Sequence, residues 1–451
     1  MRVPAWLRPA TGTSIALSPG RMPLGRPDGP IVILGDPGTV FVQHPARYWR
    51  RQGIETVIVS GRTAEPLSCL EDGTPVIAAE GRQSALARRE WTMMEPILCS
   101  IEEQLGGLET ERRRLVSAAW GPGKNLPSLA AAARTGLAVS EVVRELRPRA
   151  VFGQEAFVYG LATALSYGAP RTLCVWGGDV QLFAEASLLH HALCRFALQS
   201  VESVAVCAAP IRTRVIEAFG VPETRVHPIS FGVDTTLFAP LHGDERDRLR
   251  AALGLPQRAV VVTNVRRFDP LWGCQVVFEA CLRAAERMGA AHFVFIGGIG
   301  NDERLDAARR QVAGCGLESR FSFFGGNLQM QEFARLVCAT DVAISASGYI
   351  EPKSWSVLQT MAAGAAVIVG DQPAYRELAA AGADLALVDG SSPDAIAGAV
   401  EALVNDVDRR EAMVSTNVSY IRDHEDEREQ MARLLRIVEH DQFRQPARAS
   451  I

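Results

Sequence analysis

Short apolar runs alternate with longer amphipathic segments from residue 30 onward, and this pattern predicts strands separated by helices. In the first half, runs rich in Val and Ile predict strands at 31–35, 56–61, 75–79, 150–154, 172–178, 203–207 and 225–229. Helical periodicity predicts helices at 40–52, 157–168, 183–200 and 210–219, and a mostly helical stretch at 83–147. Because such strands are apolar on both faces, we expect a parallel sheet with helices on both sides.

A second alternation of the same kind follows a linker near residues 230–245. Its apolar runs predict strands at 259–265, 292–298, 320–326, 341–347, 365–371 and 385–390. A last long helix is expected at roughly 408–440, where it either covers one domain or bridges the two. The pattern therefore predicts an α/β protein of two doubly wound, Rossmann-like domains that face each other across a cleft. Ligands of open α/β sheets bind at the carboxyl ends of the strands, so the cleft is the expected site.

The domain limits follow from this pattern. Residues 1–28, which are rich in Pro and contain no long apolar run, are expected to form a loose tail and not a signal peptide. The first domain is predicted at 29–235, the second at 236–425, and a C-terminal helix and tail at 426–451.

Composition narrows the class of protein. The chain has 451 residues, of which 47% are hydrophobic and 22% charged, and a net charge of -4 gives no general attraction to nucleic acid or anionic lipid. Nine cysteines without a CxxC pair indicate reduced thiols, not a zinc site or a disulfide framework. No apolar run is long enough to span a bilayer. We therefore expect a cytoplasmic protein.

The stretch EPKSWSVLQTMAAGAAVIVGD, residues 351–371, combines an acid, a helix start and a buried strand. Amide groups at a helix start bind anions, so Lys353, Ser354 and Trp355 are a candidate phosphate site. Only two lysines occur in the chain, which makes the charge of Lys353 notable. Glu351 has the chemistry to accept hydrogen bonds from sugar hydroxyls. The alternative is an ordinary helix start with an acid as its cap.

Other candidate residues follow predicted strands at their carboxyl ends. Arg266 and Arg267 follow the run AVVVTNV, where a guanidinium is able to grip a diphosphate with parallel hydrogen bonds, or else is a solvated charge. Glycines at three strand ends let the backbone approach phosphate or sugar closely, although such turns also need glycine for their geometry; they include Gly35, Gly38, Gly298 and Gly325. Asp179 and His44 are expected to face the cleft from the first domain, and a lone histidine is more often structural.

Several of these stretches together resemble the retaining glycosyltransferases of family 4, which have the two-domain GT-B fold. The matching stretches of the second half are PISFGVDTTLFAP (228–240), NVRRFDPLWG (264–273), FVFIGGIG (293–300), FSFFGG (321–326) and the stretch 347–371. The first half fits more diffusely, through ILGDPGTVFVQH, RRQGIETVIVSGR, RPRAVFGQEAFVYG and VWGGDV. The resemblance covers about residues 30–440.

The resemblance implies transfer of a sugar from a nucleoside-diphosphate sugar, the co-substrate, to an unidentified acceptor with retention of configuration. It also implies that the reaction needs no metal and no cofactor, because cationic side chains and helix amides stabilise the leaving phosphate. It assigns Glu351 to the sugar hydroxyls, Arg267 and the amides of residues 353–355 to the diphosphate, and the position of Gln359 to the ribose. Together with the candidates from the strand ends, the predicted site has Glu351, Asp179 and His44 as catalytic groups; Arg267, Lys353, Ser354, Trp355, Gly35 and Gly38 at the donor diphosphate; and Gln359, Gly298 and Gly325 at the ribose and base.

Two positions depart from the family pattern. Trp272 stands where the family usually has a lysine five residues after the arginine, and Gln359 stands where it usually has a second glutamate. Loss of an ammonium removes a charge-assisted hydrogen bond worth about 1.5–3 kcal/mol. We therefore predict that Lys353 replaces the missing charge at the diphosphate.

Three alternatives to a glycosyltransferase remain open: an epimerase, a phosphorylase and a binding protein without activity. A nucleotide-sugar epimerase or a sugar phosphorylase would use the same fold, although a phosphorylase would carry a pyridoxal-bearing lysine in the second domain on another element. A nucleotide-sugar-binding protein without activity is also consistent with Trp272 and Gln359.

The stretch 83–147, with Trp91, Met93, Met94 and the basic run 111–114, is either a helical cover or a contact with a membrane surface or lipid-linked acceptor.

Overall fold

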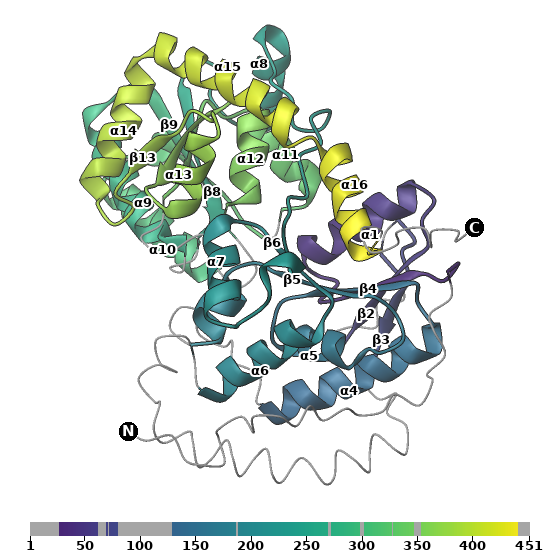
Figure 1. Ribbon diagram of the computed structural model, residues 1–451. Coiled ribbons are helices and arrows are strands. Elements are labelled where there is room, and N and C mark those ends of the chain that lie inside the picture. The colour runs from purple at the N-terminus through teal and green to yellow at the C-terminus, as the bar shows by residue number, and fades with distance from the viewer. Residues whose placement is uncertain are drawn as a thin grey trace, which may run out of the picture.

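The computed structural model describes residues 27–61, 69–70, 72–79, 129–185, 188–268, 272–297, 302–326, 328–346 and 353–440. Two domains, each built on one parallel sheet, are joined by two chain crossings (Figure 1). The prediction of a two-domain α/β fold is confirmed.

The first sheet has seven parallel strands in the order β3-β2-β1-β4-β5-β6-β7. Its strands are β1 (Ile31–Leu34), β2 (Thr56–Ser60), β3 (Val76–Ala78), β4 (Ala150–Gln154), β5 (Arg171–Val175), β6 (Ser203–Val206) and β7 (Val226–Pro228). The described helices of this domain are α1 (Val40–Arg51), α4 (Leu129–Leu146), α5 (Val158–Leu165), α6 (Leu188–Ser200) and α7 (Ala209–Glu217). The predicted helix at 183–200 begins later, because residues 179–183 form a π-helical turn.

The alternation of side chains along β1 explains its two covered faces. Ile31 and Ile33 pack in one cluster with α1, whereas Val32 and Leu34 pack in another with α4. All four side chains are fully buried. A strand whose every side chain is apolar is therefore stable only between two layers of helices.

The second sheet has six parallel strands in the order β10-β9-β8-β11-β12-β13. They are β8 (Val260–Arg267), β9 (Ala291–Ile296), β10 (Phe321–Phe324), β11 (Val342–Ser345), β12 (Ala366–Gly370) and β13 (Ala386–Val388). Its helices are α8 (Gly243–Ala252), α9 (Cys274–Arg287), α10 (Asp302–Gly314), α11 (Met330–Cys338), α12 (Trp355–Ala362), α13 (Pro373–Ala380), α14 (Pro393–Asn405) and α15 (Val407–His424). Each of the six predicted strands is present, with limits that move by a few residues.

The predicted last helix is in fact two helices, α15 and α16 (Glu427–Val438). Asp426 separates them, because its carboxylate accepts hydrogen bonds from the amides of Arg428 and Glu429 and caps a new helix start. α15 packs on the second domain, and α16 returns to the first, where Met431 and Leu434 lie in the same cluster as residues of β1 and α1. Figure 1 shows α16 beside α1. The C-terminal segment thus bridges the domains.

The two crossings are joined to each other. The linker between β7 and α8 runs beside the break between α15 and α16: the amide of Val233 donates to the carbonyl of Glu425 at 2.7 Å, and the amide of Glu427 donates to the carbonyl of Val233 at 3.3 Å. Gly232 has a φ of +69°, and a Cβ there would lie 2.5 Å from the Cα of Glu427. We call these two segments, residues 229–235 and 424–427, the hinge.

Within the described residues, no helix is both long and apolar enough to cross a bilayer. In the same part of the chain, no group of three or more His, Cys, Asp or Glu side chains is placed to hold a metal ion. The stretch 83–147 is described only from residue 129, so its predicted membrane or acceptor contact lies outside the described residues.

Candidate functional site

The end of β8 and the start of α12 meet at the carboxyl edge of the second sheet. Nη1 of Arg266, the penultimate residue of β8, donates a hydrogen bond of 2.7 Å to Oγ of Ser354, the residue that precedes α12. Ser354 is extended (φ −75°, ψ 126°) and does not cap the helix with its own side chain. The first turn of α12 therefore keeps amide groups without an intrahelical partner, as every helix start does. This is the geometry of an anion site.

Arg267 is the last residue of β8, and its side chain is exposed. Its neighbour Arg266 is half-buried and lies over the ring of Trp272, with Cζ 3.9 Å from the ring centroid. The structure thus brings Arg266, Trp272 and Ser354 together around the helix start. The sequence analysis assigned Arg267 to the diphosphate, whereas the contact with the start of α12 is made by Arg266; the assignment of Arg267 stays a prediction.

Lys353 lies at the same helix start, and its ammonium is 2.5 Å from Oε1 of Glu425 in the hinge. The side chain of Lys353 is 20% exposed and that of Glu425 only 4%. The indole nitrogen of Trp355 donates to the carbonyl of Gly232, also in the hinge, at 2.6 Å. Both side chains therefore tie the candidate anion site to the hinge.

An aromatic cluster fills the space between the domains beside this helix start. Its members come from α1, the end of β5, the hinge and α12; they are Phe41, His44, Trp176, Phe231 and Trp355. The ring of His44 lies 4.7 Å from that of Trp355 and 5.5 Å from that of Phe231.

His44, predicted as a catalytic group, is thus part of an interdomain packing cluster. Its Nε2 lies 3.3 Å from a carboxylate oxygen of Glu427. Burial lowers the pKa of the His44 imidazole to about 4, and the positive charge of Arg51 acts in the same direction. Burial raises the pKa of Glu427 to about 7, with the negative charge of Asp234 adding to the effect. A neutral imidazole beside a protonated carboxyl is the state that this environment favours.

Asp179, the other predicted catalytic group of the first domain, is 5% exposed and surrounded by backbone amides. One oxygen accepts hydrogen bonds from the amides of Gly177 at 2.9 Å and Val180 at 3.0 Å, and the other accepts from the amide of Ala156 at 3.0 Å. Burial raises its pKa to about 6, although these amides oppose the rise. The carboxylate thus joins the loop that follows β4 to the loop that follows β5. Its catalytic role stays a prediction.

Glu155 is a residue that the sequence reasoning missed. It directly follows β4 and has a φ of +71°, a left-handed conformation that is uncommon for a residue with a side chain. Its carboxylate accepts hydrogen bonds from the amides of Phe157 at 2.9 Å and Tyr159 at 2.6 Å, at the start of α5. Burial raises its pKa to about 8. The signal in the sequence was an acid immediately after the predicted strand 150–154.

Gly35 and Gly38 lie in the loop between β1 and α1. A Cβ on Gly35 would lie 2.3 Å from Cγ2 of Val42, so this position requires glycine for packing alone. The amide of Gly38 donates to Oδ1 of Asp36 at 2.8 Å. Their assignment to the diphosphate stays a prediction.

Gln359 is 3% exposed within α12, and its Nε2 lies 3.4 Å from Sδ of Met330 on α11. It is therefore turned toward the neighbouring helix. Gly325 follows β10 at an exposed position. Glu351 and Gly298 lie outside the described residues, so their roles stay predictions.

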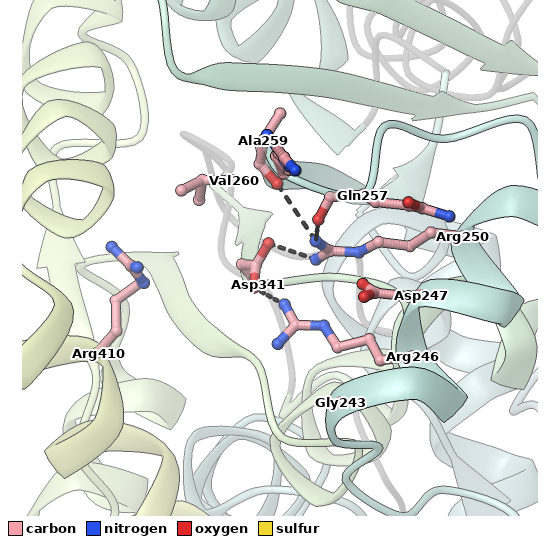
Figure 2. Close-up of a pocket in the computed structure, with 10 residues that line it drawn as sticks. Gly243, Arg246, Asp247, Arg250, Gln257, Ala259, Val260, Asp341 and Arg410 are labelled. Carbon is pink, nitrogen blue, oxygen red and sulfur yellow. Dashed lines mark hydrogen bonds and ion pairs between the residues drawn. The ribbon is translucent and has the colours of Figure 1, made fainter.

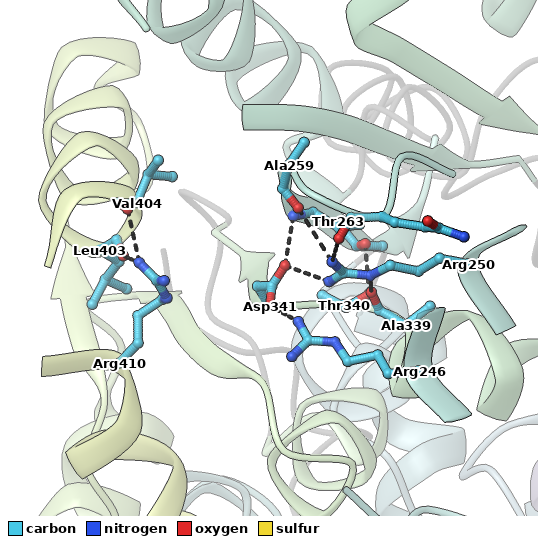
Figure 3. Close-up of polar contacts among 12 residues, drawn as sticks. Arg246, Arg250, Ala259, Thr263, Ala339, Thr340, Asp341, Leu403, Val404 and Arg410 are labelled. Carbon is cyan, nitrogen blue, oxygen red and sulfur yellow. Dashed lines mark hydrogen bonds and ion pairs between the residues drawn. The ribbon is translucent and has the colours of Figure 1, made fainter. Parts of the chain in front are cut away.

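Two adjoining cavities occupy the opposite, amino-terminal edge of the second sheet. The first, of about 270 Å³, lies between α8 and α15 and is lined by Arg246, Arg250, Arg258, Arg410 and Asp341, among others (Figure 2). The second, of about 330 Å³, shares Arg246, Asp341 and Arg410 with it. Figure 3 shows that the guanidinium groups of Arg250 and Arg410 are bound by backbone carbonyls and, for Arg250, by Asp341. These arginines join segments of the second domain at the edge of the sheet that lies opposite the start of α12.

Residues 245–418 match the family of glycosyl transferases group 1. The second domain is a group 1 glycosyl transferase domain. The match contains β8, Arg266, Arg267 and α12, and therefore the whole described part of the helix-start site.

Curated relatives match the chain over less than half of its length. One is the D-inositol 3-phosphate glycosyltransferase of Corynebacterium glutamicum, which is 27% identical over 201 residues, 44% of this chain and 48% of the relative. Another is the GDP-mannose-dependent alpha-(1-6)-phosphatidylinositol monomannoside mannosyltransferase of Mycobacterium tuberculosis, which is 30% identical over 207 residues, 45% of this chain and 52% of the relative. The chain thus matches about half the length of these glycosyl transferases.

Solved structures extend the likeness to both domains. Anabaena HepE, solved in complex with UDP and glucose, superposes with a TM-score of 0.67 at 16% identity and covers 90% of this chain and 98% of its own. The sucrose-phosphate synthase of Thermosynechococcus elongatus gives a TM-score of 0.69 at 14% identity, with 92% and 98% covered. At such low identity these likenesses show the fold, which is GT-B.

Proposed function

We propose that the protein is a glycosyltransferase that moves a sugar from a nucleoside-diphosphate sugar to a hydroxyl of an acceptor, with retention of configuration. The observation that carries this proposal is the contact between Arg266 and Ser354, which sets an arginine of β8 against the start of α12 inside a group 1 glycosyl transferase domain. Cationic side chains and helix-start amides at one point suit a leaving diphosphate.

In the reaction, the bond between the anomeric carbon and the β-phosphate oxygen breaks, and a bond from that carbon to the acceptor oxygen forms on the same face. The acceptor proton passes to the leaving phosphate, and nucleoside diphosphate is released. Negative charge grows on the phosphate, so the stabilising groups are cations and amides. We assign Arg267 and the amides of residues 353–355 to the diphosphate and Glu351 to the sugar hydroxyls.

His44 and Asp179 have other tasks in this proposal. The burial of His44 among aromatic rings suits a contact between the domains. The carboxylate of Asp179 accepts hydrogen bonds from backbone amides of two loops, which suits a role in shaping the acceptor side of the cleft. A protein base is not required, because the leaving phosphate itself accepts the proton.

The names of the relatives suggest which substrates to try first. The mannosyltransferase uses GDP-mannose, and HepE was solved with UDP. Both curated relatives are named for acceptors that contain inositol, free or lipid-linked. We propose UDP- or GDP-hexose as donor and an inositol-containing hydroxyl compound as acceptor.

The test uses the purified full chain with UDP-, GDP- and ADP-hexoses and inositol 3-phosphate. Released nucleoside diphosphate is measured, and the anomeric configuration of the product is read by proton NMR. Arg267→Ala is expected to lower turnover with the preferred donor, whereas Arg287→Ala, an exposed arginine of α9 paired with Glu401, serves as the matched control. A protein that binds nucleotide but transfers no sugar to any acceptor would favour the binding-protein alternative, and one that binds no nucleotide would refute the proposal.

A further inference from the structure

Trp272 stands where the resemblance leads one to expect a lysine, yet a positive charge is present at its side chain. The guanidinium of Arg266 lies over the indole ring, with Cζ 3.9 Å from the ring centroid. A planar guanidinium stacks on a tryptophan face and is attracted to it electrostatically. The ring therefore holds one face of the cation and leaves its edge to act as a hydrogen-bond donor.

A β-bulge in β8 puts Arg266 in this position. The pairing with β9 joins Asn264 to Phe295 and Arg267 to Ile296, so Val265 and Arg266 are two extra residues on β8. Nδ2 of Asn264 donates to the carbonyl of Arg266 at 3.2 Å and fixes the bulge. Bulges re-aim side chains and are frequent beside active sites.

The edge of the guanidinium is directed at the start of α12. Nη1 donates to Oγ of Ser354 at 2.7 Å, and that hydroxyl lies 2.9 Å from Oγ of Ser356 in the first turn of the helix. Ser354 is 5% exposed, so the contact is largely shielded from water. Arg266 is thus held on its face by Trp272 and on its edge by the helix start.

Lys353 is less well placed for the same task. Its ammonium is engaged by Glu425, whose side chain is almost fully buried. Moving Lys353 to a phosphate would leave that carboxylate buried without its cation, which is costly. Arg266, by contrast, is stacked on a neutral ring and donates a hydrogen bond to a hydroxyl.

We propose that Arg266, stacked on Trp272, supplies the diphosphate-binding charge for which the family uses the lysine absent here. This inference rests on the proposed function of the domain and names the ligand as the diphosphate of a nucleoside diphosphate. Arg266 is a binding residue, and Trp272 is a positioning residue that acts through it. The exchange of lysine for tryptophan is then a relocation of the charge and not its loss.

The experiment is a titration of the full chain with UDP, GDP and inorganic pyrophosphate, followed by calorimetry. Arg266→Ala is expected to weaken the binding of the preferred nucleotide and of pyrophosphate by roughly 10- to 100-fold. Trp272→Ala keeps the charge of Arg266 but removes the ring on which its guanidinium is stacked. It is expected to weaken binding by about threefold to tenfold. The double variant Arg266→Ala with Trp272→Lys is expected to recover most of the lost affinity, because the charge returns on the neighbouring residue.

Controls separate loss of charge from loss of fold. Arg266→Gln retains a donor toward Ser354 without a charge, and Arg287→Ala removes a remote arginine. Each variant is also checked by thermal melting. Wild-type affinity in a folded Arg266→Gln variant would overturn the inference, and so would failure of the lysine to rescue binding in a folded double variant.

The outcome for the proposed function is read separately. If pyrophosphate binding depends on Arg266 but no sugar is transferred, the inference stands and the activity falls. If sugar is transferred and Arg266→Gln binds donor normally, the activity stands and the inference falls. If the wild-type chain binds neither nucleotide nor pyrophosphate, both are overturned.

Discussion

The ammonium of Lys353 lies 2.5 Å from Oε1 of Glu425, so the helix start in the glycosyl transferase domain is joined directly to the hinge. The backbone carbonyl of the same glutamate accepts a hydrogen bond of 2.7 Å from the amide of Val233. One residue thus contacts both chain crossings and the candidate anion site. The ion pair is therefore a structural link between the candidate anion site and the segments that join the domains.

Lys353→Ala is expected to lower the free energy of unfolding by about 3 kcal/mol, because it leaves the Glu425 carboxylate buried without a cation. The double variant Lys353→Met with Glu425→Gln is expected to recover most of that loss, since no buried charge remains. Chemical denaturation of the three proteins measures both effects. If the single variant is as stable as the wild type, the pair is a surface contact with no structural weight.

His44 predicts a pH dependence of stability. Its folded-state pKa of about 4 lies below the ordinary value of 6.5, so the unfolded state takes up a proton first. The stabilisation is fully present above pH 6.5 and is lost as the pH falls toward 4, up to about 3 kcal/mol. His44→Gln is expected to flatten the stability curve between pH 6.5 and 4.

The control for this prediction is His242→Gln, at an exposed position in front of α8. It is expected to leave the curve unchanged. Glu427 contributes with the opposite sign: its folded-state pKa of about 7 is raised, so its contribution is present below pH 4.5 and lost as the pH rises through 7. Glu427→Gln is therefore measured in parallel, and a curve that keeps its acid slope in His44→Gln would contradict the assignment to His44.

Two variants of Asp179 distinguish a structural role of its carboxylate from a catalytic role. Asp179→Ala leaves the amides of Gly177, Val180 and Ala156 without their acceptor and is expected to destabilise the first domain by about 3 kcal/mol. Asp179→Asn keeps one acceptor oxygen and is expected to cost less. Melting temperature and turnover are compared in both variants: a stable Asp179→Asn protein without turnover would support the catalytic assignment.

The strands were predictable because the physical demand on them is local. The run IVIL, apolar at every position, is stable only inside a covered parallel sheet, and it forms such a strand. The helix start at Ser354 was also predictable, because its signal lies in residues that are neighbours in the chain. The break at Asp426 was missed, although an acid followed by Glu427 and Glu429 in the next turn is a capping pattern.

The contacts of the site were not predictable, because they join distant residues. His44 meets Trp355 only after two domains have packed together. The resemblance singled out Arg267, but a bulge in β8 places Arg266 against α12. No periodicity of side chains marks such a bulge, so only the fold distinguishes the two arginines.

The far edge of the second domain gives a last prediction, on stability. Oδ2 of Asp341 lies 2.5 Å from Nη2 of Arg250 and accepts the amide of Val261 at 2.7 Å, while Arg246 binds the other oxygen (Figure 3). The side chain of Arg250 is 4% exposed, and burial lowers its pKa to about 10. Arg250→Ala is expected to reduce the free energy of unfolding by about 3–5 kcal/mol, because it leaves backbone carbonyls and a shielded carboxylate unpaired. Arg287→Ala, which breaks an exposed pair, is expected to cost less than about 1 kcal/mol. Denaturant unfolding of both variants compares them, and equal losses would show that the buried joint has no more weight than a surface ion pair.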